Sequence, residues 1–282
     1  MPTNKQEEIK NKALNLFISQ TKIQKEEITS IEYLLDGYTN NSFLINTLNG
    51  DKYIVRIGSV CKHINRKNEY EILEILSKNN ESDILYFNHF NGDMIRKFIV
   101  GHTPNYQDIH SKTFLNLLAK KISSFHKIEI NQKILVNDYY AYKDIKLPID
   151  NKYEIMYYHL LEKNKNLPLV LSHNDLSPWN IIYNDEKKEI HFIDFEWIRL
   201  NNIYFDIATF IHQADLYETD EYYYFINQFE EKINLQTLEE FLYIGAFFTY
   251  QWTFSSDSYK DTSGFRNIAY NLMMKIYKKF KK

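Results

Sequence analysis

The sequence predicts an α+β fold in two lobes, with a small, mostly antiparallel sheet in the first lobe and mainly helices in the second. Residues 1–100 alternate short apolar runs with turn chemistry, and Asn49-Gly50-Asp51 is a strong hairpin signal among them. Residues 101–282 carry apolar residues at helical spacing in one long segment after another. We therefore predict lobes over residues 1–100 and 101–282, joined by a hinge near residues 100–103.

The first lobe begins with a helix, and a second helix follows its third strand. Apolar residues at three- and four-residue spacing indicate the helices, and short apolar runs between turns indicate the strands. The predicted helices cover 5–19 and 65–78, and the predicted strands cover 31–35, 42–47, 52–57, 84–88 and 94–99.

The second lobe has three short strand signals among its helices. Its predicted helices cover 111–127, about 150–163, 206–217, 219–231, 236–255 and about 264–280, and its strands cover 169–171, 181–183 and 190–193. The last two strands form a hairpin around residues 184–188. A cleft between two lobes is a common ligand site, so we expect the ligand there.

Charge and cysteine content exclude several classes of protein. The 34 basic and 37 acidic residues leave a net charge of −3, which provides no global positive field for nucleic acid. Cys61 is the one cysteine, so an intramolecular disulfide is impossible. The polar N-terminus lacks an apolar signal region, and the apolar stretch 241–254 is shorter than the ~20 residues that span a bilayer. We expect a cytoplasmic protein without stable membrane insertion, as a monomer or homodimer.

The segment LSHNDLSPWN, followed by the hairpin and Asp194, contains the residues that phosphoryl transfer requires. Asp175 follows an apolar strand, where it could orient an attacking hydroxyl and accept its proton. Asn180 lies five residues later, and the hairpin returns Asp194 to its vicinity. An amide oxygen and a carboxylate that converge in this way are ligands of the kind Mg²⁺ prefers. The order of these residues predicts a kinase that moves the γ-phosphate of ATP onto a hydroxyl.

With IHFIDFEW after it, this segment resembles the core of the choline/ethanolamine kinase and aminoglycoside phosphotransferase superfamily, which has a protein-kinase-like fold. The resemblance extends along nearly the whole chain in order. In the first half, DGYTNNSFLI is similar to the glycine-poor phosphate loop of choline kinases, YIVRIGS is similar to their third strand, and INRKNE is similar to the start of the next helix. RKFIVGHT is similar to their hinge. In the second half, LAKKISSFHK is similar to a helix before the active site, and YFDIATFIHQ is similar to the helix after the metal Asp. The bacterial choline kinase branch is the most similar.

The resemblance implies a role for each matching residue. Asp175 would be the catalytic base, and Asn180 and Asp194 would hold Mg²⁺. Arg56 would contact the ATP phosphates and pair with Glu69. The nucleotide-binding set also includes the phosphate-loop residues Gly37, Thr39 and Asn40. His173 would brace the catalytic loop, and Asp206 would hold that loop by hydrogen bonds.

The predicted acceptor is choline or a related amino alcohol, because aromatic faces with nearby carboxylates recognise a quaternary ammonium group. The candidate aromatic residues are Trp197, Tyr217, Phe248, Tyr250 and Trp252, and the predicted substrate set is Asp175, Glu196, Trp197, Gln213 and Trp252. Gln213 occupies the position where choline kinases place an acidic residue. Asp215 or Glu218 could replace that acid, although their helical phase differs, and ethanolamine stays open as the acceptor.

Two other functions remain open. An aminoglycoside- or thiamine-type phosphotransferase would share the same catalytic residues. Antibiotic kinases usually have acidic acceptor loops, whereas residues 131–152 mix Asp138, Asp144 and Asp150 with four lysines, Lys133, Lys143, Lys146 and Lys152. A nucleotide-binding pseudokinase adaptor would have lost Asp175 or Asp194, and both are present.

Overall fold

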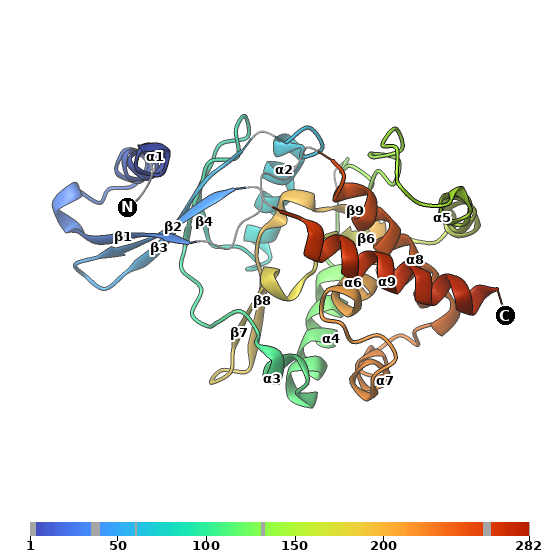
Figure 1. Cartoon of the computed structure of the whole chain (residues 1–282). Helices are drawn as coiled ribbons and strands as arrows, with labels where there is room; N and C mark the ends of the chain where they lie inside the picture. Colours follow the sequence, from blue (N-terminus) through green and yellow to red (C-terminus); the bar gives the residue numbers. More distant parts are fainter. Residues whose placement is uncertain (1–3, 35–39, 60, 131–132, 256–260, 282) are drawn as a thin grey trace. The chain divides into compact units, whose positions relative to one another are not determined.

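The computed structural model describes all of the chain except residues 1–3, 35–39, 60, 131–132, 256–260 and 282 (Figure 1). It divides into two compact units, Met1–Ile99 and Val100–Lys282.

Unit 1 is built on a five-stranded antiparallel sheet with the order β1-β2-β3-β5-β4. A hairpin turn through Gly50, whose φ of 86° suits glycine, connects two of its strands. The register places Phe43 opposite Val55 and Arg56 opposite Met94, so the position of Arg56 in the sheet is fixed. The strands are β1 (Ile28–Leu34), β2 (Asn41–Thr47), β3 (Lys52–Ile57), β4 (Ile84–Phe87) and β5 (Met94–Lys97).

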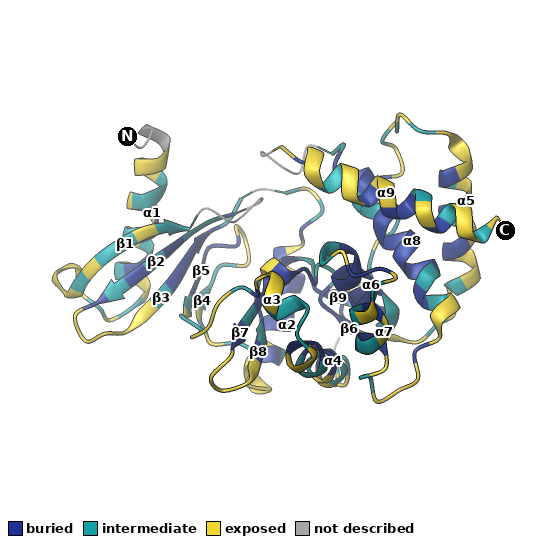
Figure 2. Cartoon of the chain, turned by 60° about the horizontal axis from the view of Figure 1, so that its bottom comes forward, coloured by how far each residue is buried: buried dark blue, intermediate teal, exposed yellow. Residues whose placement is uncertain are grey.

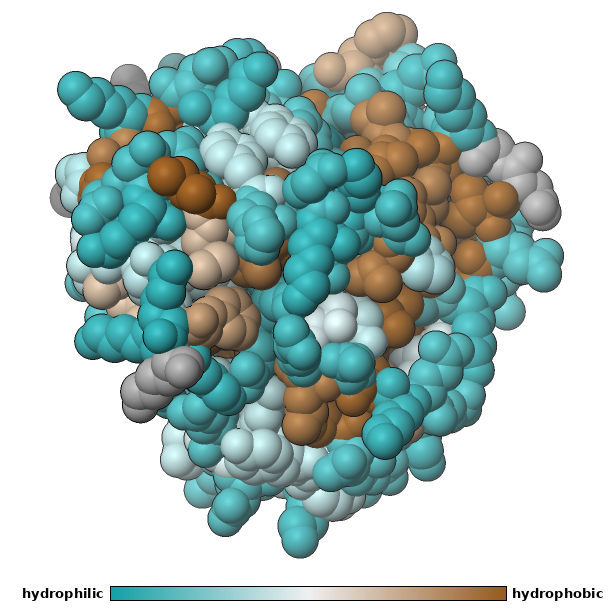
Figure 3. Space-filling model, turned by 90° about the vertical axis from the view of Figure 1, so that its right-hand side faces the viewer, coloured by the Kyte–Doolittle hydropathy of each residue, from teal (hydrophilic) through white to brown (hydrophobic). Residues whose placement is uncertain are grey.

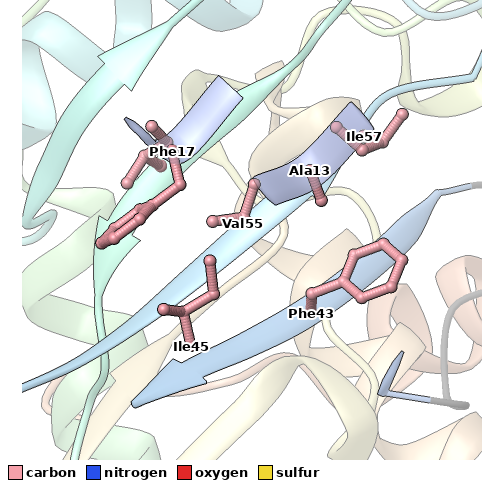
Figure 4. Packing of buried hydrophobic residues seen from close by; sticks show 7 residues of the cluster. Ala13, Phe17, Phe43, Ile45, Val55 and Ile57 are labelled. Atoms are coloured by element: carbon pink, nitrogen blue, oxygen red, sulfur yellow. The ribbon is translucent and has the colours of Figure 1, made fainter. Parts of the chain in front are cut away.

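Helix α1 (Asn4–Gln20) covers one face of this sheet and closes the core of unit 1. Ala13 and Phe17 of α1 point toward Phe43, Val55 and Ile57 of β2 and β3 (Figure 4). Each of these residues is at most 5% exposed. A short 3-10 helix, η1 (Lys25–Glu27), connects α1 to the sheet.

Helix α2 (Arg66–Lys78) follows β3 and packs on β4. Asn65 caps its first turn, because its side chain accepts a hydrogen bond from the Asn68 backbone at 2.9 Å. The first turn carries Arg66 and Glu69, both of which are buried. The cap therefore sets the helical phase that turns these two charged residues inward.

Helix α8 (Leu235–Trp252) is the central helix of unit 2, and Figure 2 shows it as largely buried. It packs against three other helices, α5, α6 and α9. Its apolar run therefore forms a core helix. The other helices of this unit are α3 (Tyr106–Ile109), α4 (Lys112–His126), α5 (Asn151–Asn164), α6 (Ile203–Gln213), α7 (Asp220–Ile226) and α9 (Ser263–Phe280).

Two small antiparallel pairs of strands lie among these helices. Strand β6 (Leu169–Ser172) pairs with β9 (Arg199–Asn202), and β7 (Ile181–Asn184) pairs with β8 (Glu189–Phe192). A backbone bridge between His102 and Tyr183 connects the chain after Gly101 to the β7–β8 hairpin. Two 3-10 helices, η2 (Pro178–Asn180) and η3 (Phe195–Trp197), flank this hairpin in the sequence.

The predicted α+β fold class is confirmed, with an antiparallel sheet in the first unit and mainly helices in the second. Several details differ, including the short helix α3, which has no counterpart among the predicted helices. Strand β9 has no counterpart among the predicted strands. The helices predicted over 206–217 and 219–231 end early, at Gln213 and Ile226. After α6 the backbone passes through Asp215 at φ 52° and Glu218 at φ 64°, conformations that a helix does not allow.

Polar and charged side chains cover most of the face in Figure 3, with apolar surface gathered between them. Ile155, Leu235 and Ile268 are examples of exposed apolar residues in unit 2. Among the helices that the structure describes, none combines the length and the apolar character needed to cross a bilayer.

Candidate active site

The loop that carries Asp175 begins where β6 ends, and its backbone is held in an unusual conformation. Asn174 has a φ of 63°, a left-handed conformation that asparagine tolerates better than most residues. The backbone N–H groups of His173 and Asn174 donate to the two carboxylate oxygens of Asp206, at 2.9 and 2.8 Å. Asp206 is 1% exposed and lies in the first turn of α6. The hydrogen bonds expected from Asp206 to the loop are therefore present.

Two histidines complete the support of this loop. His126, the last residue of α4, lies 2.9 Å from Asp206 through Nε2, and His173 Nε2 lies 2.9 Å from the carbonyl of Ile193. Burial alone would raise the pKa of Asp206, but the hydrogen bonds from His126 and from the His173 backbone lower it. Burial lowers the pKa of His173, which keeps this ring neutral and suits it to bracing the loop.

Asn180 joins the two ends of the loop. Its Nδ2 donates to the backbone carbonyl of Asp175 at 2.7 Å and to the Asp175 carboxylate at 2.9 Å. The amide nitrogen therefore faces Asp175, which leaves Oδ1 as the Asn180 atom that can bind a cation. Pro178 occupies the first position of η2, where its fixed φ suits a helical turn.

The β7–β8 hairpin returns the chain to Asn180, as its sequence predicts. The N–H of Ile193 donates to the Asn180 carbonyl at 3.0 Å, and Asp194 is the next residue. Asp194 has a φ of 61°, so a second residue of the site is held in the left-handed region. Strain of this kind at a carboxylate that follows a strand is typical of functional sites.

Negative charge accumulates around Asp175. Burial, followed by the charges of Asp194 and Glu196, raises the pKa of Asp175 to about 8, and the hydrogen bond from Asn180 opposes this rise. A cation at this position would offset the repulsion among the carboxylates. The oxygen donors of Asn180 and Asp194 are of the type that Mg²⁺ prefers. Within the described residues, no group of three or more His, Cys, Asp or Glu side chains could hold a metal. Mg²⁺ usually takes one or two protein carboxylates and fills its other positions with phosphate and water.

In unit 1, Arg56 and Glu69 form the buried pair that the sequence predicts. Arg56 Nη2 lies 2.6 Å from Glu69 Oε1, and Arg56 Nε donates to the carbonyl of Gly92 at 3.1 Å. Both side chains are at most 4% exposed. A buried charge pair with additional hydrogen bonds holds the guanidinium in one place.

A second arginine, Arg66, binds the other oxygen of Glu69 at 2.8 Å. Its Nη2 also donates to Asn40 Oδ1 at 3.1 Å and to the Ser59 carbonyl at 3.2 Å. Sequence reasoning gave Arg66 no role, although the spacing of Arg66 and Glu69, three residues apart on a helix, is a signal for such a pair. Two buried arginines thus share one carboxylate, which leaves an excess of positive charge among these three side chains.

The predicted phosphate-loop residues are only partly described. Asn40 is buried, and its side-chain oxygen accepts from Arg66 and from the Ser59 backbone at 3.2 Å. Gly37 and Thr39 lie outside the described residues.

The structure disperses the predicted acceptor residues over several elements of unit 2. Trp197 lies 6.0 Å from the Arg199 guanidinium, and Trp252 packs edge-on against Phe265 at 6.2 Å. In the described part of the chain, no ring contact joins the two tryptophans. Gln213, half-buried, ends α6, and Glu196 is 5% exposed.

The other candidate aromatic residues have partners of their own. Tyr217 is buried beneath Lys275, whose Nζ lies 4.9 Å from its ring, and Phe248 packs against Tyr142 at 5.3 Å. Tyr250 is 4% exposed and packs against Phe254. The contacts of Tyr217, Phe248 and Tyr250 are therefore packing contacts within unit 2.

The residues considered as substitutes for the acid at Gln213 are not on the helix. Asp215 and Glu218 both follow the end of α6, so a comparison of helical phase does not apply to them. Glu218 is bound by Lys275 at 2.8 Å, which neutralises its charge locally.

Comparisons with known proteins agree with this fold. A family model for choline/ethanolamine kinase matches residues 31–154 and 141–250. The MG356 homolog of Mycoplasma pneumoniae is 29% identical over 249 residues, which are 86% of this chain and 85% of that protein. Probable ethanolamine kinase A of Dictyostelium discoideum is 28% identical over 214 residues, which are 66% of this chain and 60% of that protein. The crystal structure of choline kinase LicA from Streptococcus pneumoniae has a TM-score of 0.74 and 21% identity, with 98% of both chains covered.

Fold and family together define a small-molecule kinase, an ATP-binding phosphotransferase whose acceptor is an alcohol group. Within that class, the chain belongs to the choline/ethanolamine kinase family. The resemblance predicted from the residues around Asp175 is thereby confirmed.

Proposed function

We propose that the protein transfers the γ-phosphate of ATP to the hydroxyl of choline or a related amino alcohol, with Asp175 as the catalytic base. The observation that carries this proposal is the Asp175 carboxylate, which Asn180 holds at 2.9 Å in the loop that follows strand β6. A carboxylate fixed in this way can orient the acceptor hydroxyl and accept its proton late in an in-line transfer.

In this proposal, ATP binds with the help of Mg²⁺ and of Arg56. Mg²⁺, bound through Asn180 and Asp194, would supply charge neutralisation to the phosphates. Arg56 would contact the ATP phosphates, and Glu69 and the Gly92 carbonyl hold its guanidinium in place. Arg66 supports this arrangement by holding the second oxygen of Glu69.

A cationic acceptor suits the charge around Asp175. After burial, the carboxylates of Asp194 and Glu196 are the largest causes of the raised pKa of Asp175, and their negative charge favours a cation nearby. Trp197, one residue after Glu196, offers an aromatic face for such an acceptor, and Trp252 stays the second aromatic residue that we propose for it. Gln213 lacks the charge of the acid that choline kinases place at this position, so the proposal keeps ethanolamine beside choline as an acceptor.

An assay of ADP release with a panel of acceptors tests this proposal. The full chain with Mg·ATP is incubated with choline, ethanolamine, thiamine or kanamycin, and kcat/KM is determined for each. We expect choline or ethanolamine to give the highest value. A preference for kanamycin or thiamine would refute the proposed acceptor class.

Asp175→Ala tests the role of the base in the same assay. Loss of a general base typically costs on the order of 10²–10⁴-fold, so we expect kcat to fall by that amount while ATP still binds. Asp185→Ala, which removes an exposed carboxylate from the β7–β8 turn, is the matched control and should keep full activity. Full activity of Asp175→Ala would refute the assignment.

A further inference from the structure

A chain of side-chain hydrogen bonds leads from the segment before α5 to the residue that precedes Asp175. The hydroxyl of Tyr139 donates to Asn201 Oδ1 at 2.5 Å, and Asn201 Nδ2 donates to Asn174 Oδ1 at 2.6 Å. Asn174 Nδ2 in turn donates to the carbonyls of Ser172 and Arg199, at 2.9 and 3.2 Å. No role assigned above uses Tyr139 or Asn201.

Tyr139 is itself fixed from several sides. The backbone just before it runs beside β9, because Leu200 N–H donates to the Leu135 carbonyl at 2.8 Å and Asn137 N–H donates to the Leu200 carbonyl at 2.9 Å. The hydroxyl of Tyr157 donates to the Tyr139 carbonyl at 2.7 Å. The Tyr139 ring packs edge-on against Phe205 of α6 at 5.6 Å. Burial raises the pKa of the Tyr139 phenol, so the hydroxyl stays protonated and serves as the donor.

We call the side-chain hydrogen bonds of Tyr139, Asn201 and Asn174 the relay. Each of these residues donates to the next one, from Tyr139 to Asn201 and from Asn201 to Asn174. Asn201 Oδ1 also accepts from the Asn202 backbone N–H at 2.7 Å, which fixes the oxygen on that side and the nitrogen toward Asn174. If the Asn201 amide were reversed, its NH₂ group would face two other donors, the Tyr139 hydroxyl and the Asn202 backbone N–H. Because Asn201 is 2% exposed, water cannot easily replace any of these partners.

The relay acts on the residue whose backbone directs Asp175. Asn174 holds a left-handed conformation, its N–H is bound by Asp206, and its side chain is held by Asn201. Its backbone and its side chain are thus both fixed, and the peptide that leads into Asp175 has little freedom. Small errors in the placement of a catalytic group can cost about 10²-fold in rate, so such a restraint matters for turnover.

We propose that Tyr139 and Asn201 are positioning residues, which hold Asn174 so that Asp175 is aimed at the acceptor hydroxyl. This inference rests on the proposed role of Asp175. The segment before α5 thereby contributes to turnover through the catalytic loop without touching ATP or the metal.

Tyr139→Phe tests the relay because it removes one hydroxyl and keeps the ring. We expect kcat to fall about tenfold while the KM for ATP changes less than about twofold, since the loop is misaimed but the nucleotide site is intact. The matched control is Tyr243→Phe, which removes another buried hydroxyl of the same unit, bound to the Tyr153 carbonyl at 2.9 Å. Tyr243→Phe should lower the thermal midpoint of unfolding about as much as Tyr139→Phe does, and it should leave kcat unchanged.

Asn174→Gly provides an independent test, because glycine adopts the left-handed conformation without strain but cannot join the relay. We expect kcat to fall as in Tyr139→Phe. The double variant should be no slower than the slower single variant, because both changes break the same relay.

Three results would overturn the relay: wild-type kcat in Tyr139→Phe, an equal loss of kcat in Tyr243→Phe, or losses that multiply in the double variant. Each of these, combined with an inactive Asp175→Ala, would leave the proposed function standing. Full activity of Asp175→Ala would refute the proposed function and the relay together, because the relay is proposed to position the Asp175 carboxylate.

Discussion

Two residues of the candidate site are held in left-handed backbone conformations, Asn174 just before Asp175 and Asp194 just after β8. Such conformations cost about 1–3 kcal/mol for most residues and persist only where the surrounding contacts impose them. Here Asp206 and Asn201 impose the conformation of Asn174 through backbone and side-chain hydrogen bonds. Asparagine and aspartate adopt this region more readily than other residues with a side chain, so the residue types suit their positions.

The proposed role of Asp194 in binding Mg²⁺ leads to a prediction at the residue scale. Asp194→Asn removes the charge and keeps both the size and the tolerance for a positive φ. We expect the affinity for ATP in the presence of Mg²⁺ to fall at least tenfold, because the metal loses its one proposed carboxylate ligand. Calorimetric titration with and without Mg²⁺ measures this effect.

The control for that experiment is Asp185→Asn, the same change at an exposed residue of the turn between β7 and β8. Its Mg·ATP affinity should match that of the native protein. If Asp194→Asn also binds Mg·ATP with unchanged affinity, Asp194 is not a metal ligand.

At the scale of elements, the β7–β8 hairpin connects Asn180 to Asp194, and a backbone bridge between His102 and Tyr183 holds it in unit 2. The chain reaches this bridge through Gly101, whose φ is 144°. A Cβ at Gly101 would lie 2.6 Å from the carbonyl oxygen of Tyr183. Only glycine therefore fits beside the hairpin without displacement of its backbone.

Gly101→Ala should destabilise the protein by about 1–3 kcal/mol, because alanine is strained at this φ and its methyl group meets backbone. We also expect lower kinase activity, since the displaced hairpin carries Asp194. The control is Gly245→Ala inside α8, where a Cβ would meet nothing within 4 Å. That change should stabilise the helix by about 0.5–1 kcal/mol. Equal unfolding midpoints for the two variants in urea would contradict this account.

Helices and hairpins with strong local signals were predictable from the sequence, whereas β9 was not. Its residues, Arg199–Asn202, include one apolar side chain and show no alternation that would indicate a strand. They form a strand because β6 on one side and residues 135–137 on the other satisfy their backbone groups. The same tertiary pairing places Asn201 beside Asn174, which explains why the relay was invisible in the sequence.

At the scale of the whole molecule, each of the two units has a core of its own. In unit 1, Phe43 and Val55 lie opposite each other on neighbouring strands beneath α1. In unit 2, α8 packs against three other helices. Because the apolar side chains of each unit pack mainly on one another, local damage to one core should be felt first in its own unit.

Phe43→Ala tests this independence. A large-to-small change at a residue that is 1% exposed should cost about 3–5 kcal/mol in the stability of unit 1. Hydrogen exchange should then show weaker protection in the strands of unit 1, while α8 keeps its native protection. Phe90→Ala, at a residue that is 85% exposed, is the control and should change neither unit. Equal loss of protection in both units would show that they unfold together.

The sequence by itself determined the α+β fold class, the family, and the order of Asp175, Asn180 and Asp194, because hairpin turns, helical periodicity and a compact motif are local signals. The family resemblance also implied the pair of Arg56 and Glu69, which the structure contains. The tertiary structure decided which distant groups meet: Arg66 with Asn40, Asp206 with the backbone of His173 and Asn174, and Tyr139 with Asn201. These contacts join residues that lie far apart along the chain, so only the folded backbone brings them within hydrogen-bond distance.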